Sequence, residues 1–159
     1  MPPEVLAESI DEKRFKSFQM ADIYSFSLLL WEIVMHSELN PALSSTYKPP
    51  YYEWVGLDPS FDDMKKVVSI EKKRPSLAPF LGQFKTKADR LNDENKEGDV
   101  QVNSSEADKQ LITGICELIE NCWLEDASKR FDYLEIRKRF SIIINQDRIS
   151  SKIVPDQRF

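Results

Sequence analysis

Apolar residues are most concentrated in the passage MADIYSFSLLLWEIVMH, residues 20–36. From Asp22 to about His36 they fall on every face of a helix, and this pattern is typical of a helix packed by protein on all sides. Only nine uncharged residues separate Asp22 from Glu32, whereas a bilayer core requires about 20. The passage therefore predicts a central buried helix rather than a membrane span.

Further helical signals lie on both sides of this passage, and no segment alternates apolar and polar residues long enough to predict a strand. PPEVLAES, near the N-terminus, places its prolines where the first turn of a short helix tolerates them. Three later segments start with residue pairs that have the spacing of a helix cap: Ser60 and Asp63, Ser105 and Asp108, and Asp132 and Glu135. The pattern predicts an all-α fold.

The segments between these helices have the composition of loops. IDEKRFKSF, residues 10–18, is charged, and residues 38–59 contain four prolines without apolar periodicity. Residues 82–107 are polar and rich in charge, and we expect this insertion to be disordered. We assign residues 1–146 to one partial domain and residues 147–159 to a tail without a core signal.

Composition narrows the classes of partner. The net charge of −5 and pI of about 5.0 disfavour a nucleic-acid partner or a broad contact with anionic lipid. Cys116 and Cys122 lie six residues apart on one predicted helix, on different faces, so they are expected to be reduced thiols. With two cysteines and the single histidine His36, no cluster has the ligands of a structural metal site.

An ordered series of short motifs suggests a family. MPPE at the start, ADIYSFSLLLWEI, RP at 74–75, CW at 122–123 and Arg130 follow one another in the order of the second half of a protein-kinase C-lobe, which this chain resembles. MPPE is similar to the Ala-Pro-Glu motif that ends the activation segment, and CWLEDASKR is similar to the stretch between the kinase H and I helices. The match has departures: Pro2 replaces alanine, Tyr24 tryptophan, Ser27 glycine and Ala127 proline.

Within the kinases, FKSFQMADIY, PPYYEWVGLDPSFDDMKKVV and KKRPSL most resemble the type I receptors of the TGF-β/activin/BMP family of serine/threonine kinases. The resemblance covers residues 1 to about 80 and 108 to about 145. It implies the kinase helices EF, F, G, H and I, with the polar insertion between G and H. The stretch between RP and CW is longer than in those receptors.

The resemblance also implies structural site residues. Glu4 and Arg130 would form the ion pair that ties the activation segment to the lobe; the alternative is two unrelated surface charges. Asp22 would accept hydrogen bonds from backbone amides of the catalytic loop, although its position also permits a plain helix N-cap. Trp31, in the central helix, and Trp123, in the CW motif, would be structural.

A kinase transfers phosphate with a Gly-rich loop, a strand lysine, a His-Arg-Asp base and an Asp-Phe-Gly magnesium ligand. The four glycines of this chain cannot form a Gly-rich loop, and neither His-Arg-Asp nor Asp-Phe-Gly occurs in it. We therefore assign no catalytic, cofactor-binding or metal-binding residue, and we expect the chain alone to be inactive. ATP and magnesium would belong to the intact parent protein.

The resemblance implies a C-terminal fragment of a type I receptor kinase. Its parent would phosphorylate serines of Smad proteins, downstream of a type II receptor, on the cytoplasmic side of the membrane as part of a single-pass receptor. The segment would contact the rest of the kinase domain and not the membrane; standing alone, it would be cytoplasmic.

The alternative is a non-catalytic, kinase-derived helical interaction module. A complete module covers its own central helix, whereas a fragment leaves an apolar patch on it.

The stretch PPYY, residues 49–52, allows a second binding hypothesis because it matches the Pro-Pro-x-Tyr pattern that WW domains recognise. Type I receptors have a similar stretch as part of their fold. The structural interpretation is favoured.

Overall fold

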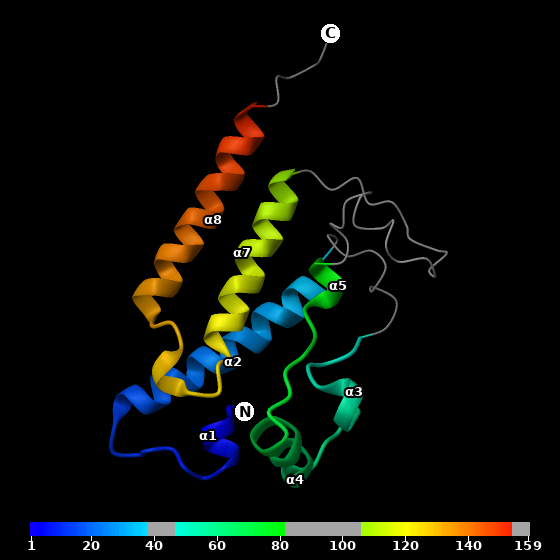
Figure 1. Ribbon diagram of the computed structural model, residues 1–159, viewed down its shortest axis with the longest axis vertical. Coiled ribbons are helices and arrows are strands. Elements are labelled where there is room, and N and C mark those ends of the chain that lie inside the picture. The colour runs from blue at the N-terminus through cyan, green and yellow to red at the C-terminus, as the bar shows by residue number, and fades with distance from the viewer. Residues whose placement is uncertain (38–46, 82–105, 154–159) are drawn as a thin grey trace.

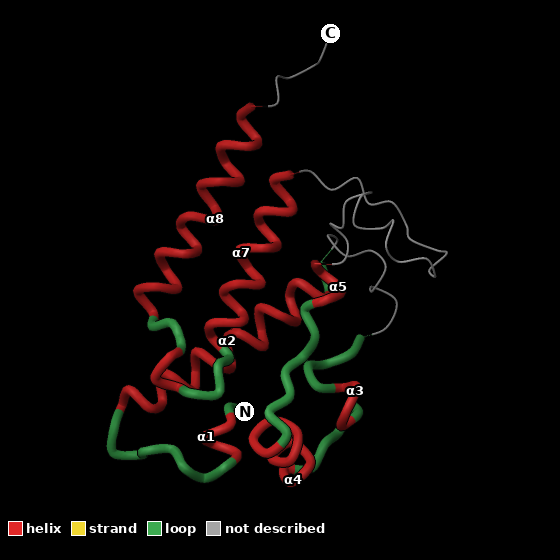
Figure 2. Tube along the Cα trace, in the orientation of Figure 1, coloured by secondary structure: helices red, strands yellow, loops and turns green. Residues whose placement is uncertain are grey.

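The computed structural model describes residues 1–37, 47–81 and 106–153, and every regular element in those ranges is a helix (Figures 1 and 2). The prediction of an all-α fold is confirmed. In chain order the elements are α1 (Pro3–Leu6), α2 (Phe15–Met35), α3 (Tyr52–Val55), α4 (Phe61–Met64), the π-helical turn η2 (Lys65–Ile70), α5 (Ala78–Leu81), α7 (Glu106–Cys122), the 3₁₀ turn η4 (Ala127–Lys129) and α8 (Tyr133–Ile153).

Two long helices, α7 and α8, pack along each other, and α2 packs across α7. Figure 1 shows α7 and α8 projecting towards one end of the molecule, while the short helices α1, α3 and α4 lie at the other end. α1 packs against η2, and α5 packs against α7. α2 is therefore the element that connects the two ends. Among the described residues, no helix is long and apolar enough to span a membrane.

The core gathers side chains from elements far apart in the sequence. The buried cluster comprises Leu6, Tyr24, Leu30, Trp31, Val34, Tyr51, Val67, Val68, Leu77, Phe80, Ile112, Cys116, Ile119 and Trp123. α2 supplies four of these, which agrees with its predicted place at the centre of the core.

Two predictions about α2 are wrong. The helix begins at Phe15, not at Asp22, so half of the predicted charged loop is helical. The pattern gave no sign of this start, because Arg14 forms no side-chain cap and Phe15 and Phe18 in the first turns are exposed. The helix is also not packed on all sides: Leu29 is 54% exposed and Ile33 is 56% exposed.

Two predicted helix caps are confirmed. Ser60 and Asp63 form a reciprocal capping box, in which the Asp63 N–H donates to Ser60 Oγ at 3.2 Å and the Ser60 N–H donates to Asp63 Oδ2 at 3.2 Å. The Ser60 hydroxyl, which donates to Asp63 Oδ2 at 2.6 Å, and then the Ser60 N–H lower the pKa of the Asp63 carboxyl. At the start of α8, the Glu135 N–H donates to Asp132 Oδ1 at 2.9 Å. Ser105, from the third pair, lies outside the described residues.

Several predicted boundaries shift. Residues 106 and 107, assigned to the insertion, are the first residues of α7, while residues 82–105 lie outside the described part of the chain. The predicted loop 38–59 contains α3, and its residues 38–46 also lie outside the described part. The tail was expected from residue 147, but α8 continues to Ile153, because a helix can continue without an apolar face once an earlier part of it is packed.

Candidate functional site

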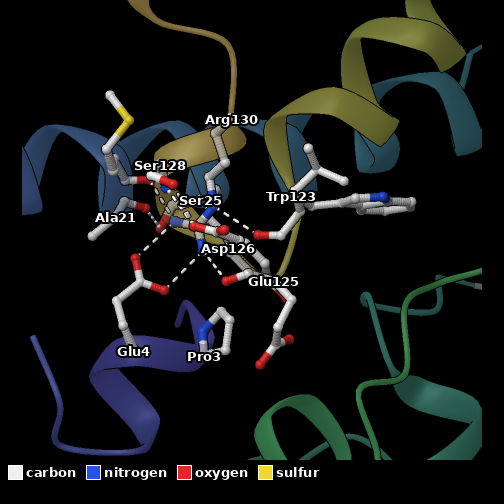
Figure 3. Close-up of polar contacts among 12 residues, drawn as sticks. Pro3, Glu4, Ala21, Ser25, Trp123, Glu125, Asp126, Ser128 and Arg130 are labelled. Atoms are coloured by element: carbon white, nitrogen blue, oxygen red, sulfur yellow. Dashed lines mark hydrogen bonds and ion pairs between the residues drawn. The ribbon is translucent and has the colours of Figure 1, made fainter.

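Glu4 and Arg130 lie 126 positions apart in the sequence, and the structure brings them together in a bidentate ion pair (Figure 3). Arg130 Nη1 donates to Glu4 Oε1 at 2.7 Å, and Nη2 donates to Glu4 Oε2 at 2.8 Å. The Arg130 side chain is fully buried, and the Glu4 side chain is 16% exposed. Paired geometry of this kind gives the strongest carboxylate–guanidinium contact.

The remaining donors of Arg130 are bonded to backbone carbonyls. Nε donates to the carbonyl of Leu124 at 2.8 Å, and Nη1 also donates to the carbonyl of Met20 at 2.8 Å. A buried charge is tolerated only when its donors are satisfied, and here one guanidinium joins α1, α2 and the turn after α7. Local structure places Arg130, since Asp126 caps η4 by accepting the Ser128 N–H at 3.0 Å and Arg130 follows η4 directly.

A second arginine, Arg74, reaches the same cluster from the loop after η2. Its Nε donates to the carbonyl of Trp123 at 2.9 Å, and its Nη2 donates to Glu125 Oε2 at 2.8 Å. The guanidinium carbon atoms of Arg74 and Arg130 lie 5.2 Å and 5.0 Å from the centroid of the Tyr24 ring. The aromatic ring that stands where kinases have tryptophan thus contacts both cations.

The Tyr24 hydroxyl extends the cluster to the loop that precedes α3. Its oxygen lies 2.6 Å from the Tyr51 hydroxyl oxygen, and both side chains are buried. Burial raises the pKa of both phenols. Tyr51 has a φ of +70°, a left-handed conformation that is uncommon for a residue with a side chain. Tyr51 is the third residue of the PPYY stretch, and its burial supports the structural interpretation of that stretch.

Sequence reasoning found Glu4 and Arg130 but gave no role to Arg74, Tyr24 or Tyr51 in this cluster. Arg74 is part of the RP motif, and Tyr24 stands where the kinase pattern has tryptophan, but neither motif assigned a contact. No spacing in the sequence indicates that Arg74 and Arg130 share one ring, because that contact depends on how η2 and η4 pack beside α2.

Asp22 lies apart from the cluster, on the exposed side of α2. It is inside the helix, eight residues into it, so the alternative of a plain N-cap is wrong. Within the described part of the chain, its carboxylate has no hydrogen bond or ion pair. The hypothesis that it binds a catalytic loop stays a prediction.

The two predicted tryptophans are both buried. Trp31 Nε1 donates to the carbonyl of Ser76 at 3.0 Å, which ties α2 to the loop before α5. Trp123 directly follows α7 and supplies the carbonyl that accepts from Arg74. Through these hydrogen bonds, each tryptophan joins separate elements of the core.

The cluster has no group suited to covalent chemistry. Cys116 and Cys122 are free and buried, as predicted, and burial raises the pKa of each thiol to about 11, which disfavours the reactive thiolate. No group of three or more metal-ligating side chains occurs in the part of the chain that the structure describes. The arrangement can hold segments together.

Comparison with known proteins finds relatives named activin receptor type-1 or activin receptor type-1-like. No protein-family model matches the chain. The chain is 32% identical over 145 residues to activin receptor type-1-like of Homo sapiens. It is 33% identical over 145 residues to activin receptor type-1 of Gallus gallus and of Homo sapiens.

Each of these alignments covers 91% of this chain but only 23% or 24% of the relative. The chain thus spans about a quarter of the length of the curated relatives it matches. Its helical fold and its ordered motifs agree with the place in a kinase domain that the resemblance implied. Over the part that it spans, the chain is thus homologous to activin receptor type-1, a type I receptor kinase of the TGF-β family.

Proposed function

We propose that this chain is the C-terminal fragment of a type I receptor serine/threonine kinase. Its whole protein transfers phosphate from ATP, with magnesium, to serines of Smad proteins, downstream of a type II receptor and on the cytoplasmic side of the membrane. The observation that carries the proposal is the bidentate pair of Glu4 and Arg130, because it joins the two ends of the motif series.

In this proposal the ion pair acts as a clamp. Glu4 ends the MPPE motif, and its carboxylate holds that segment on α2 and η4 through a fully buried guanidinium. A substrate-binding segment fixed in this way keeps its geometry during phosphate transfer, and small misplacements lower transfer rates strongly. Tyr24 supports the clamp because its ring contacts the guanidinium of Arg130. Arg74 and Tyr51 in turn contact the ring and the hydroxyl of Tyr24.

The exposed side of α2 supports the fragment rather than the self-contained interaction module. Asp22 lies on the same side of α2 as Leu29 and Ile33, which are both more than half exposed. Apolar side chains together with a carboxylate on a central helix are expected to be covered in the complete protein. We propose that the rest of the kinase domain covers this side, with backbone amides of the catalytic loop donating to Asp22.

The fragment by itself is expected to bind neither ATP nor magnesium. Its sequence contains none of the His-Arg-Asp, Asp-Phe-Gly or Gly-rich motifs that hold these groups. Activity therefore requires residues supplied by the rest of the kinase domain.

A chimera tests the proposal. The corresponding C-terminal part of activin receptor type-1 of Homo sapiens is replaced by this chain, and phosphorylation of a Smad protein is measured with ATP and magnesium. We expect the chimera to phosphorylate the Smad protein, and we expect Asp22→Asn and Arg130→Met to lower its rate at least tenfold.

The exposed pair of Arg14 and Asp11 supplies the matched control, and Arg14→Met is expected to leave the rate unchanged. A folded chimera that binds ATP but phosphorylates no serine would overturn the proposal. Phosphate transfer by the 159-residue chain alone would contradict its predicted inactivity.

A further inference from the structure

A hollow of about 400 Å³ lies between α7 and α8. Its volume falls within the range of small-molecule sites. None of the side chains that bond within the Glu4–Arg130 cluster lines it, so the proposed kinase function does not use it. Its walls are Lys109, Gln110, Thr113, Gly114, Glu117 and Leu118 from α7, and Phe131, Arg139, Ile142 and Ile143.

Gly114 allows α7 and α8 to approach closely at this hollow. A Cβ atom at Gly114 would lie 2.9 Å from Ile143 Cγ1, which is closer than carbon atoms normally approach. Glycine inside a helix is destabilising relative to alanine, and the close approach gives a physical reason for its presence here. Leu118 and Ile143 are buried and Ile142 is 45% exposed, so this part of the hollow is apolar.

The charges in the hollow are unequally paired. Arg139 Nε lies 2.8 Å from Glu135 Oε1, and Arg139 Nη1 lies 4.0 Å from Glu117 Oε2. The guanidinium of Arg139 is therefore already engaged by two carboxylates and offers no free positive charge to a ligand. Lys109 is half-buried and has no ion pair or hydrogen bond among the residues that the structure describes.

Two further features indicate the ligand. Thr113 follows Lys109 by one helical turn, so its hydroxyl is on the same side of α7. The guanidinium carbon of Arg139 lies 5.4 Å from the centroid of the Phe131 ring, and this pair presents a flat wall. The hollow thus offers a cation without a partner among the described residues, a hydroxyl, an apolar floor and a flat wall. These features suit a small molecule with one negative charge and an aromatic body.

We propose that the hollow between α7 and α8 binds a small aromatic monocarboxylate. The carboxylate accepts from the Lys109 ammonium and the Thr113 hydroxyl. The aromatic body lies on Ile142 and Leu118, beside Phe131. Binding here does not rest on the proposed kinase function.

Titration of the 159-residue chain with 2-naphthoate tests the site, with ligand fluorescence and amide NMR shifts as readouts. We expect saturable binding, with the largest shifts at Thr113, Gly114 and Ile142. Lys109→Gln is expected to weaken binding roughly five- to tenfold, since it removes a charged hydrogen-bond donor that is half-exposed. Ile142→Ser is expected to weaken it roughly threefold or more, since it removes apolar contact area.

Matched controls are available on α8. Lys138→Gln and Ile144→Ser change exposed residues of the same types outside the hollow and are expected to leave the affinity unchanged. The neutral analogue 2-naphthalenemethanol is expected to bind more weakly than 2-naphthoate. No saturable binding at millimolar 2-naphthoate, or equal affinity in Lys109→Gln and Lys138→Gln, would overturn the proposal.

Discussion

The two sides of α2 differ in whether their polar groups have partners within the chain. On the side that faces η4, the carbonyl of Met20 and the ring of Tyr24 meet the guanidinium of Arg130, and each polar group there has a partner within the chain. On the other side, Asp22 has no bonded partner among the described residues, and Leu29 and Ile33 are more than half exposed. One side of α2 is thus bonded and packed within the described chain, whereas the other side is exposed.

The difference separates what the chain stabilises by itself from what it offers to other protein. Buried polar groups without partners are costly, so the side that faces η4 must be satisfied whenever the chain folds. An exposed carboxylate and scattered apolar residues cost little in water. Sequence changes on the two sides should therefore affect different measurements, stability on one side and association on the other.

The largest effect is expected from Arg130→Met. This change leaves Glu4 without its partner and the carbonyls of Met20 and Leu124 without donors, and breaking a buried pair costs roughly 3–5 kcal/mol. The free energy of unfolding from urea denaturation measures the loss. Arg14→Met, at an arginine that is 79% exposed, should cost well under 1 kcal/mol. Equal losses in the two variants would show that the buried ion pair stabilises the chain no more than an exposed one.

A smaller loss is expected from Tyr24→Phe, about 1–3 kcal/mol, because it leaves the buried Tyr51 hydroxyl without its partner. The double variant Tyr24→Phe with Tyr51→Phe should lose less than the sum of the single losses, since it removes both ends of one hydrogen bond. Urea denaturation of the three variants gives the coupling free energy. Strict additivity would show that the two hydroxyls do not interact.

Alkaline pH should weaken the core in a defined window. Burial raises the pKa of Cys116 and Cys122 from 9.0 to about 11, so between these values the folded chain keeps protons that the unfolded chain releases. The contribution of the two thiols to the free energy of unfolding should therefore be constant below pH 9 and fall as the pH rises from 9 to 11. The raised pKa of Tyr24 acts in the same direction above pH 10.

Urea denaturation in the presence of a reductant measures this pH dependence. The variant Cys116→Ala lacks one of the two thiols and should lose less stability between pH 9 and 11 than the unchanged chain. A free energy of unfolding that stays constant up to pH 11 would contradict the predicted shift.

The smallest effect on stability is expected on the exposed side of α2. Leu29→Ser and Ile33→Ser should each change the free energy of unfolding by about 0.5 kcal/mol or less, while reducing self-association measured by sedimentation velocity. Leu30 directly follows Leu29 but is buried, so Leu30→Ser should destabilise the chain by several kcal/mol. Unchanged self-association in the two exposed variants would show that this side of α2 is not a contact surface.

Local sequence determined the elements where a cap or a stripe was visible. The Ser60–Asp63 box and the Asp132 cap were predicted because each depends on residues three positions apart, and such bonds form within one turn. The start of α2 was missed because Arg14 provides no cap. The end of α8 was missed because its last turns continue without a core stripe.

The ion pair of Glu4 and Arg130 was predicted from the sequence, but only through the motif resemblance. Its two residues came from matching motifs at both ends of the chain, and no physical rule applied to spacing would have joined positions 126 apart. The contacts of Arg74 and Tyr51 with Tyr24 were not predicted, because they connect loops whose positions depend on the packing of η2 and α3 around α2.

The all-helical class, the central place of α2 and the kinase-like order of motifs follow from the chain alone, since these depend on periodicity, short-range caps and residue type. Three features follow only from the folded arrangement: which side of α2 is covered, which carbonyls saturate Arg130, and the hollow that α7 and α8 enclose beside Gly114. Those features depend on the approach of segments distant in sequence, and a hydrophobic pattern records that a residue prefers burial without recording which partner buries it.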